Sequence, residues 1–495
     1  MIASQSYART RFAVVASALA LAAACSSAPL GAQSVQAISA SDKQQGAQAN
    51  PQLVAEFGGA VSGPQAAYVE TIGKNVAVRS GLSGARDDFN VTLLNSSVNN
   101  AFAVPGGYIY VTRQLVALMN NEAELAGVLG HEVGHVAARH SAKRQSRQTR
   151  NSILGVLGQV LAGAVLGNGQ LGQIGQQVVS QGTQLATLSF SRAQETEADN
   201  LGISYLKSAG YDPRAMSTVL QSLANQNTLD SQLLGQSASQ VPAWASTHPD
   251  PASRVRAALA QAGPRATGIT NRDTFLSRID GLTYGDDPRQ GIAEGRTFVH
   301  PEFRFKFTAP NGFYLMNGSN AVSITGQSGK GQLTTAAYNG DLDGYVRTAF
   351  AALGDQSQGQ AAIAPSSIEH TTVNGLPAAY GSARVNSGNG QVDVVVFAYQ
   401  FSPSQAFHFV TISQAGNSTT FNPMFASMQR ISASEAAAVR PRRLAVVSVR
   451  SSDTLSSLSS RMAYSDAKME RFLVLNGLTA SSRLVPGQRV KIVTY

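Results

Sequence analysis

The spacing of apolar residues divides the chain into three parts with different predicted structures. Between Pro51 and about Ala262, apolar residues recur at the spacing of amphipathic helices. Between about 296 and 432, apolar and polar residues alternate, as in "FRFKF", or form β-branched runs such as "VDVVVFAYQF", which indicates strands. The last segment, 442–495, predicts a strand, two helices and a second strand. The expected fold class is therefore α+β, with a mostly helical domain, a strand-rich domain and a small βααβ domain.

The segments around these parts have weaker patterns. Residues 25–50 are rich in Ser, Ala and Gln without an apolar period, and we expect a flexible tether there. The helical domain is expected over 51–265 and the strand-rich accessory domain over 296–432. Residues 266–295 are expected to be a linker, because "GPRATG" and "YGDDPRQG" are typical loop sequences.

The segment 151–191 contains no charged residue and is rich in glycine. Its apolar run is short for a transmembrane helix. A core helix, a mobile flap near a site and a membrane-touching loop are the three interpretations. The glycines favour the flap, because glycine gives the backbone conformational freedom.

The N-terminus has the layout of a secretory signal. Arg9 and Arg11 precede the apolar run "FAVVASALALAAAC", which ends in small residues, and we expect a signal peptide over 1–24 and a periplasmic location. Cys25 is the single cysteine, so no disulfide can form within the chain. Its position resembles a lipobox, which would acylate Cys25 and anchor the protein to the inner leaflet of the outer membrane. The alternative is cleavage after Ala32, which would remove Cys25 with the signal peptide.

The chain has few charged residues, and its net charge is positive. Charged residues make up 14% of the chain and the formal net charge is +9. The positive residues are scattered without a long Lys/Arg run, so nucleic-acid binding is not expected. A solvated basic surface explains this pattern, and an anionic lipid or cell-wall polymer would also suit it.

The stretch "NNEAELAGVLGHEVGHVAARH" predicts one helix that carries a metal motif. Asn121 is a good N-cap, and Glu124 three residues later completes a capping-box pattern. His131 and His135 are four residues apart and therefore share a helix face, with Glu132 at its edge. This is the H-E-x-x-H arrangement, in which two imidazoles bind zinc and the glutamate acts as general base on the zinc-bound water. The alternative is a pair of histidines whose neighbours satisfy them.

A catalytic zinc needs a third protein ligand from elsewhere. His140 is nine residues from His131, so a continuous helix would place it on the opposite side, in a structural role. In "SRAQETEADNLGISYL", Glu195 and Asp199 share a helix face, whereas Glu197 between them points elsewhere. We therefore expect Glu195 to complete the site for one Zn²⁺ per chain, and Asp199 to hydrogen-bond a ligand histidine. The alternative is an ordinary charged helix surface.

Four sequence blocks resemble the zinc metallopeptidase family that includes HtpX, the CAAX prenyl endopeptidase and the periplasmic protease BepA. The resemblance implies a zincin-type fold in the helical domain, with zinc on His131, His135 and Glu195 and with Glu132 as general base. The blocks are "NAFAVPGGYIYVTRQL" (100–115), "HEVGHVAARHS" (131–141), "SRAQETEADNLG" (191–202) and "STHPDPASR" (246–254).

The resemblance also implies roles outside the metal motif. The first block resembles an edge strand on which an extended substrate lies, with Asn100, Ala101, Phe102 and Ala103 as the substrate-binding residues. His248 matches a family position that acts either as a fourth zinc ligand, holding the enzyme latent, or in stabilising the oxyanion.

Arg254 is the other candidate for oxyanion stabilisation in that block. A simple helix start, set by the two prolines of "STHPDPASR", is the alternative for both His248 and Arg254. The uncharged segment 151–191 lies where the family often has an insert, and we interpret it as a lid.

The tail resembles a LysM domain, a βααβ module that binds peptidoglycan. "DTL", "LNGL" and "PGQRVKI" carry the match, although Ser452 replaces the usual glycine before Asp453. The resemblance implies peptidoglycan as a partner of 442–495.

The expected function is a zinc metalloendopeptidase of the bacterial envelope that cleaves unfolded or misassembled envelope and outer-membrane proteins. A non-catalytic zinc-bound chaperone or wall-anchored adaptor is the second hypothesis, and a peptidoglycan hydrolase the third. The sequence predicts neither transmembrane helices, which HtpX-type members carry, nor the C-terminal helical repeats of BepA. The binding partners of those two proteins are therefore not expected for this chain.

Overall fold

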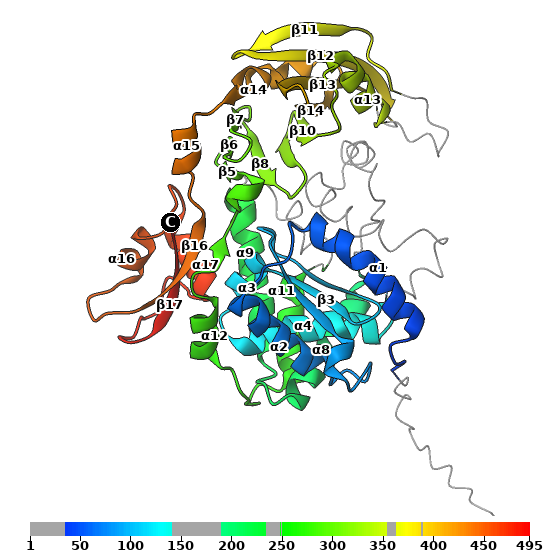
Figure 1. Ribbon diagram of the computed structural model, residues 1–495. Helices are drawn as coiled ribbons and strands as arrows, with labels where there is room; N and C mark the ends of the chain where they lie inside the picture. Colours follow the sequence, from blue (N-terminus) through cyan, green and yellow to red (C-terminus); the bar gives the residue numbers. More distant parts are fainter. Residues whose placement is uncertain (1–34, 141–189, 234–247, 249, 354–362, 388–389) are drawn as a thin grey trace, which may run out of the picture. The chain divides into compact units, whose positions relative to one another are not determined.

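The computed structural model describes residues 35–140, 190–233, 248, 250–353, 363–387 and 390–495 (Figure 1). Val35–Tyr495 forms one compact unit. The expected signal peptide, Cys25 and nearly all of the expected lid lie outside the described residues. Among the helices that the structure describes, none combines the length and the apolar character needed to cross a membrane.

The helical part surrounds a three-stranded sheet of order β1-β3-β2, in which β3 is parallel to β1 and antiparallel to β2. Helix α4 lies beside α2, α8 and α9 and next to the edge strand β2, and almost all of its side chains are buried. The elements are α1 (Ala40–Glu56), α2 (Pro64–Ala77), β1 (Asn90–Leu94), β2 (Ala101–Val104), β3 (Tyr108–Thr112), α3 (Arg113–Leu118), α4 (Glu122–Ala137), α8 (Arg192–Ser208), α9 (Ala215–Leu233), α11 (Pro251–Ala262) and α12 (Arg272–Ile279).

Helix α4 starts at the predicted residue but ends early. The side chain of Asn121 accepts a hydrogen bond from the backbone of Glu124, so the predicted N-cap is confirmed. The carboxylate of Glu124 accepts from the backbone N–H of Asn120, one residue before the position that a capping box requires. The helix ends at Ala137, because Arg139 takes a left-handed conformation with φ 55°. The predicted continuous helix through His140 was therefore wrong.

The tether prediction for 25–50 was wrong from Ala40 onward. Helix α1 occupies this segment, starting with a capping box between Ser39 and Asp42. Its apolar positions are few, but Ala49 and Leu53 pack with Phe102 and other residues of the sheet. Ala, Gln and Lys are good helix formers, and this tertiary contact supplies the stability that the weak apolar pattern does not predict.

The linker prediction for 266–295 also needs correction. Helix α12 buries Phe275, Leu276 and Ile279 in the main core, and β4 (Thr283–Tyr284) pairs with a strand of the C-terminal domain. The loop sequences on both sides are real turns, but they enclose a short amphipathic helix. This segment is therefore part of the folded body.

The strand-rich part contains a seven-stranded antiparallel sheet of order β11-β12-β13-β14-β10-β9-β8 and a four-stranded sheet of order β15-β7-β6-β5. One face of the large sheet packs against α13, and an aromatic core joins the other face to the small sheet. The elements are β5 (Ile292–Glu294), β6 (Thr297–His300), β7 (Phe305–Thr308), β8 (Phe313–Asn317), β9 (Val322–Gly326), β10 (Gly329–Thr335), α13 (Leu342–Ala351), β11 (Ile368–Val373), β12 (Leu376–Ser387), β13 (Gly390–Ser402), β14 (Gln405–Gln414), α14 (Asn422–Ser427) and β15 (Gln429–Arg430).

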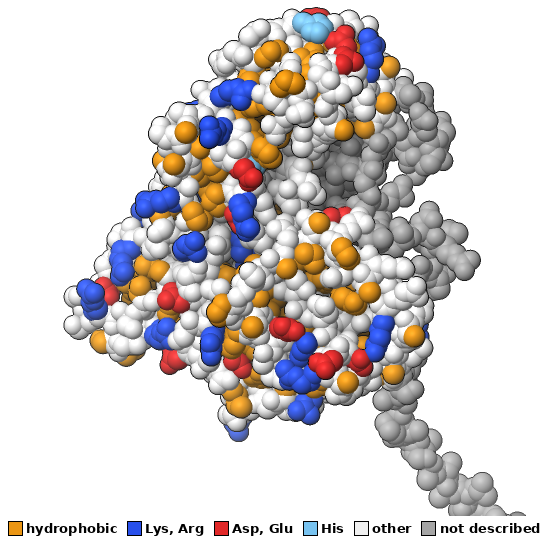
Figure 2. All heavy atoms as spheres, in the orientation of Figure 1, with side chains coloured by type: hydrophobic (Ala, Val, Ile, Leu, Met, Phe, Trp, Pro, Cys, Tyr) orange, Lys and Arg blue, Asp and Glu red, His pale blue; other side chains and the backbone are white. Residues whose placement is uncertain are grey.

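The C-terminal part has the predicted order of strand, helix, helix and strand. Its elements are β16 (Arg442–Ser448), α16 (Leu455–Ser460), α17 (Lys468–Asn476) and β17 (Arg489–Thr494). Its apolar residues Leu444, Phe472 and Ile492 belong to the same core as those of the helical part. The α+β fold class is confirmed, with the addition that the first and last parts share a core. Figure 2 shows Lys and Arg interspersed with Asp and Glu over the visible face.

Candidate metal centre

Helix α4 brings His131, Glu132 and His135 together in the interior. All three side chains are buried, and the Nε2 atoms of the two histidines are 3.0 Å apart. Two glycines let α8 approach this helix closely. A Cβ on Gly134 would lie 3.1 Å from the backbone oxygen of Ala198, and one on Gly130 would lie 3.5 Å from the Cα of Gly202. The glycines of the motif therefore allow α8, which carries Glu195 and Asp199, to approach the histidines.

Helix α8 supplies two buried carboxylates to the same place. A capping box between Ser191 and Gln194 starts this helix one turn before Glu195. The carboxylate oxygens of Glu195 lie 3.5 Å from Nε2 of His131 and 3.5 Å from Nε2 of His135. Asp199 lies 2.9 Å from Nδ1 of His131, on the other edge of that ring. The structure thus places the four residues in the arrangement that the spacing predicts.

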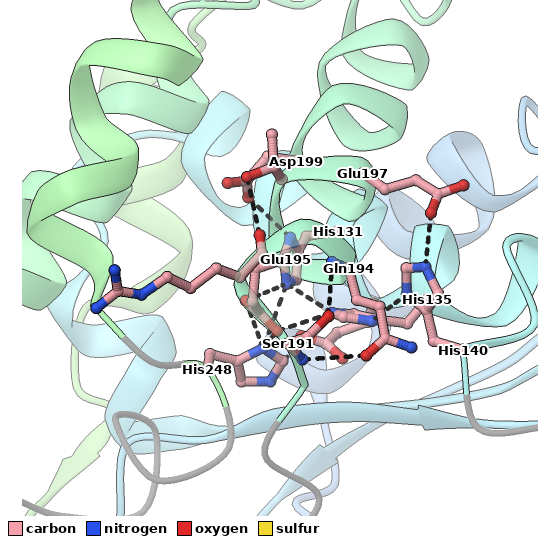
Figure 3. A network of polar contacts seen from close by, with 12 residues as sticks. His131, His135, His140, Ser191, Gln194, Glu195, Glu197, Asp199 and His248 are labelled. Carbon is pink, nitrogen blue, oxygen red and sulfur yellow. Dashed lines mark hydrogen bonds and ion pairs between the residues drawn. The ribbon is translucent and has the colours of Figure 1, made fainter. Parts of the chain in front are cut away.

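His248 joins this group from the segment before α11. Its Nδ1 is 3.2 Å from both carboxylate oxygens of Glu195 and 3.3 Å from Nε2 of His131 (Figure 3). One potential ligand atom from each of four buried residues lies within 4.8 Å of the other three. These residues are His131, His135, Glu195 and His248.

Arg254 on α11 contacts the carboxylates of the site. Its Nε and Nη2 donate to Asp199 at 2.7 and 2.5 Å, and its Nη1 donates to Glu195. This arrangement favours a charge-balancing role over the oxyanion role that the resemblance implies, because the guanidinium is engaged with two carboxylates.

The charges of the site explain the direction of each pKa. Burial would raise the pKa of Glu195, but His248 and His131 outweigh it and the pKa is lowered. Burial would also raise the pKa of Asp199, and hydrogen bonds from Arg254 and His131 lower it instead. Burial lowers the pKa of His131, but its bonds to Asp199 and Glu195 raise it to about 9. The site therefore stabilises positive charge on His131, whereas burial lowers the pKa of His135.

This charge pattern fits a divalent cation. Glu132, Glu195 and Asp199 are three buried carboxylates, and among the described residues Arg254 is the one buried guanidinium that contacts this group. Their ionised forms leave an excess of two negative charges, which is costly in a buried site without a compensating cation. Two imidazoles and a carboxylate are also the donor set of catalytic zinc sites.

Glu132 lies in the site with one oxygen that accepts no hydrogen bond from the described residues. Among the described residues its Oε1 is buried without a hydrogen-bond partner, 3.6 Å from Nε2 of His248. Burial raises the pKa of this carboxyl above its usual range. A carboxylate with a raised pKa and an oxygen that accepts no hydrogen bond, beside a cation site, is suited to take a proton at neutral pH.

The expected substrate strand is β2, at the edge of the sheet that lies next to α4. The side chain of Phe102 packs between Phe57 and Tyr110, with ring centroids 4.9 and 4.7 Å away. Asn100 and Ala101 are also buried, and Ala103 is half-buried. These side chains thus serve the core, and an extended substrate would meet the strand through its backbone.

Sequence reasoning missed His140, Glu197 and Phe190. The early end of α4 turns His140 back toward the site, where its Nδ1 lies 2.8 Å from Nδ1 of His135. The placement of His140 on the opposite side of the helix was therefore wrong. No glycine marks the left-handed Arg139, so the sequence carries no signal for this turn.

Comparisons with known proteins divide the chain in the same way. Residues 64–262 match the model of peptidase family M48, and residues 447–493 match that of the LysM domain. The chain carries an M48 peptidase domain and a LysM domain. The M48 domain includes every residue of the metal centre described above.

The M48 domain also carries the similarity to curated relatives. The beta-barrel assembly-enhancing protease of Yersinia pestis is 35% identical over 227 residues, which cover 44% of each chain. Its namesake from Escherichia coli K12 is 31% identical over 43% of this chain and 42% of its own. The mitochondrial metalloendopeptidase OMA1 of Arabidopsis thaliana is 36% identical over 35% of this chain and 31% of its own. The chain thus spans less than half the length of these relatives.

Proposed function

We propose that this protein is a zinc metalloendopeptidase of the bacterial envelope. The observation that carries the proposal is the buried group of His131, His135 and Glu195 beside the buried carboxylate of Glu132, in an M48 domain. These three residues would hold one zinc ion, and His248 would be the fourth group within reach. Bound zinc would supply Lewis-acid chemistry, which polarises the scissile carbonyl and acidifies a water molecule.

The chain's own residues account for the proton movements. Glu132 would take a proton from the attacking water at its Oε1 and return it to the nitrogen of the leaving amine. Asp199 accepts from Nδ1 of His131, which fixes the tautomer in which Nε2 carries no proton and would bind a metal. Arg254 keeps Glu195 and Asp199 ionised by pairing with both. The edge strand β2 would bind an extended substrate through backbone hydrogen bonds.

We propose unfolded or misassembled envelope proteins as the substrates. Backbone recognition at an edge strand requires an extended chain and little sequence specificity, which unfolded proteins provide. The name of the Yersinia and Escherichia relatives, and the secretory signal that the sequence predicts at 1–24, support a place in the periplasm. The LysM domain supports peptidoglycan as a further partner, and acylation at Cys25 would add an outer-membrane anchor.

The test of the activity is Glu132→Gln in the full chain. The variant should keep one bound zinc per chain and lose cleavage of casein and of a misfolded outer-membrane protein by more than about a hundredfold. Glu195→Ala should instead lose zinc, as measured by metal analysis. Cleavage by Glu132→Gln at the wild-type rate would contradict the assignment.

We further propose that His248 holds the enzyme latent. Its Nδ1 lies within the group of ligand atoms, where its bond to a metal would exclude the attacking water. His248→Ala should then raise cleavage of casein. A fall in cleavage with unchanged zinc content would assign His248 to the transition state instead, and the latent state would be rejected.

A further inference from the structure

His140 and Glu197 form a chain of polar contacts that starts at one of the metal-site histidines. His140 is fully buried, and its ring lies at 70° to that of His135, with 5.0 Å between centroids. Its Nδ1 is 2.8 Å from Nδ1 of His135, and its Nε2 is 3.1 Å from Oε2 of Glu197 (Figure 3). The side chain of Glu197, at the outer end, is 52% exposed. The chain therefore runs from the metal site to the solvent.

The protons of this chain can be assigned from chemistry. Nε2 of His135 faces His131 and Glu195, so it is the nitrogen that would bind a metal and must carry no proton. Neutral His135 then carries its proton on Nδ1, which donates to Nδ1 of His140. His140 in turn carries its proton on Nε2, which donates to Glu197. Every donor meets an acceptor, and neither ring needs to be charged.

The two metal-site histidines are therefore held differently. His131 contacts the buried carboxylate of Asp199 directly. His135 reaches a carboxylate through the ring of His140, and the ring of Phe190 stacks on its face with 3.9 Å between centroids. Stacking on Phe190 limits the tilt of the His135 ring. The hydrogen bond to His140 fixes the direction in which the ring nitrogens point within the ring plane.

We propose that His140 and Glu197 are positioning residues of the metal site, which fix the ring orientation and tautomer of His135. This inference rests on the proposed function only in that the site binds zinc. It does not require that the protein cleaves a peptide. Partners of this kind around ligand histidines change metal affinity by about 10- to 100-fold when they are removed.

The first test compares three replacements of His140 in the full chain. Gln offers an amide oxygen that accepts from Nδ1 of His135, whereas Phe fills the space and accepts nothing. Ala does neither. Zinc affinity, measured by competition with a chromophoric chelator, should fall about 10- to 100-fold in His140→Ala and His140→Phe and substantially less in His140→Gln. An affinity of His140→Phe equal to wild type would show that the ring only fills space, and would overturn the proposal.

The second test uses the exposed end, where substitution does not threaten the fold. Glu197→Ala should lower zinc affinity by about two- to fivefold, and Glu197→Gln should lie between this variant and wild type. The control is Glu70→Ala on α2, which removes another exposed helical glutamate in an ion pair and should leave the affinity unchanged. Equal zinc affinities of Glu197→Ala and Glu70→Ala would show that Glu197 does not contribute to positioning His135.

Cobalt(II) provides a readout that a purely structural role would not move. Its visible absorption depends on ligand geometry, so His140→Phe should shift the bands while the thermal midpoint of the metal-free protein changes little. Unshifted bands in all three His140 variants would overturn the proposal while leaving the zinc site intact. Failure of the wild-type chain to bind zinc or cobalt would overturn the metal site itself, together with this inference.

Discussion

The two halves of helix α4 bury carboxylates in opposite electrostatic situations. Around its C-terminal half, Glu195 and Asp199 contact Arg254 and the histidines, and their pKa values are lowered. At its first turn, the carboxylate of Glu124 accepts from Asn120, Asn121 and Thr218, which are all neutral. Burial raises the pKa of Glu124, and these donors only oppose the rise.

The C-terminal half of α4 therefore lies among charged side chains, whereas the hydrogen-bond partners of Glu124 at its first turn are neutral. The cation that opposes the rise in the pKa of Glu124 is Lys491, which comes from β17 of the LysM domain and is fully buried. Its ammonium donates to the last carbonyls of α3, those of Ala117, Leu118 and Met119, at 2.5–3.2 Å. The carboxylates near the C-terminal end of α4 would bind an added metal cation. At the N-terminal end, the cation is the side chain of Lys491.

The largest expected effect is at Arg254. Arg254→Met leaves Glu195 and Asp199 buried without their cation, so the metal-free protein should lose about 3–5 kcal/mol of unfolding free energy. Added zinc should restore part of this loss, because it supplies positive charge to the same carboxylates. Urea unfolding of the metal-free and zinc-loaded proteins measures both quantities.

The matched control for this prediction is Arg384→Met. Arg384 also makes a two-point contact with an aspartate, Asp393, but its side chain is 54% exposed. Asp393 is itself buried, but the exposed side chain of Arg384 limits the contribution of this pair to about 1 kcal/mol, so the variant should lose less than Arg254→Met and should not respond to zinc. Equal losses in the two variants would show that burial does not distinguish the pairs.

His408 in the strand-rich part extends the comparison to a buried base with a neutral partner. Burial lowers its pKa to about 4, and its Nδ1 lies 2.9 Å from the hydroxyl of Tyr345. The folded state therefore binds its proton more weakly than the unfolded state does, and stability is lost as pH falls from about 6.5 to about 4. The loss from this group should reach about 3 kcal/mol at pH 4.

His408→Gln should reduce the slope of unfolding free energy against pH within that window. Above pH 7 residue 408 is neutral in the wild type and in the variant, so the two proteins should have the same slope of unfolding free energy against pH. Urea unfolding at a series of pH values gives the comparison. An unaltered slope between pH 4 and 6.5 would mean that other groups account for acid sensitivity.

Lys491→Met tests the N-terminal end of α4. The substitution leaves three backbone carbonyls of α3 without their donor, and we expect a loss of about 2 kcal/mol. Removal of a buried charge offsets part of the cost. Lys306→Met is the control, because Lys306 pairs with Glu435 at the surface and should contribute less than about 1 kcal/mol. Thermal unfolding of the full chain would show a smaller shift for Lys306→Met than for Lys491→Met.

The sequence predicts residues that share one regular element better than residues that meet across elements. The four-residue spacings of His131 with His135 and of Glu195 with Asp199 place each pair on one helix face, and the structure has them there. Lys491 lies between apolar neighbours in "RVKIV", a local pattern that does not indicate where its side chain lies. Its burial depends on the end of α3, more than 370 residues earlier in the chain. No local pattern reports such a contact.

The position of His140 was mispredicted for a related reason. Helical periodicity holds only while the helix continues, and the left-handed turn at Arg139 occurs without the glycine that usually marks one. The helices α1 and α12 were missed because tertiary packing stabilises short or weakly amphipathic segments. The strand-rich and LysM parts were easier, because their alternating pattern extends over many residues.

The smallest expected effect is that of Glu124→Gln. The amide oxygen can accept from the backbone of Asn120, and its NH₂ can donate to Thr218, whose hydroxyl is also placed to donate to the carbonyl of Ala215. The NH₂ of Asn121 loses its acceptor, at 3.2 Å the longest of the three contacts of this carboxylate. The substitution removes a charge whose ionisation burial already disfavours. We expect a change of less than about 1 kcal/mol at pH 7, measured by urea unfolding.

The same substitution at the other half of the helix should behave differently. Glu195→Gln in the metal-free protein weakens the contact with Arg254 and should cost about 3 kcal/mol, because it leaves part of a buried cation unpaired. In a Lys491→Met background, Glu124→Gln should become neutral or stabilising, since the cation that favours the ionised carboxylate is gone. Similar losses for Glu124→Gln and Glu195→Gln would remove the proposed difference between the two halves of α4.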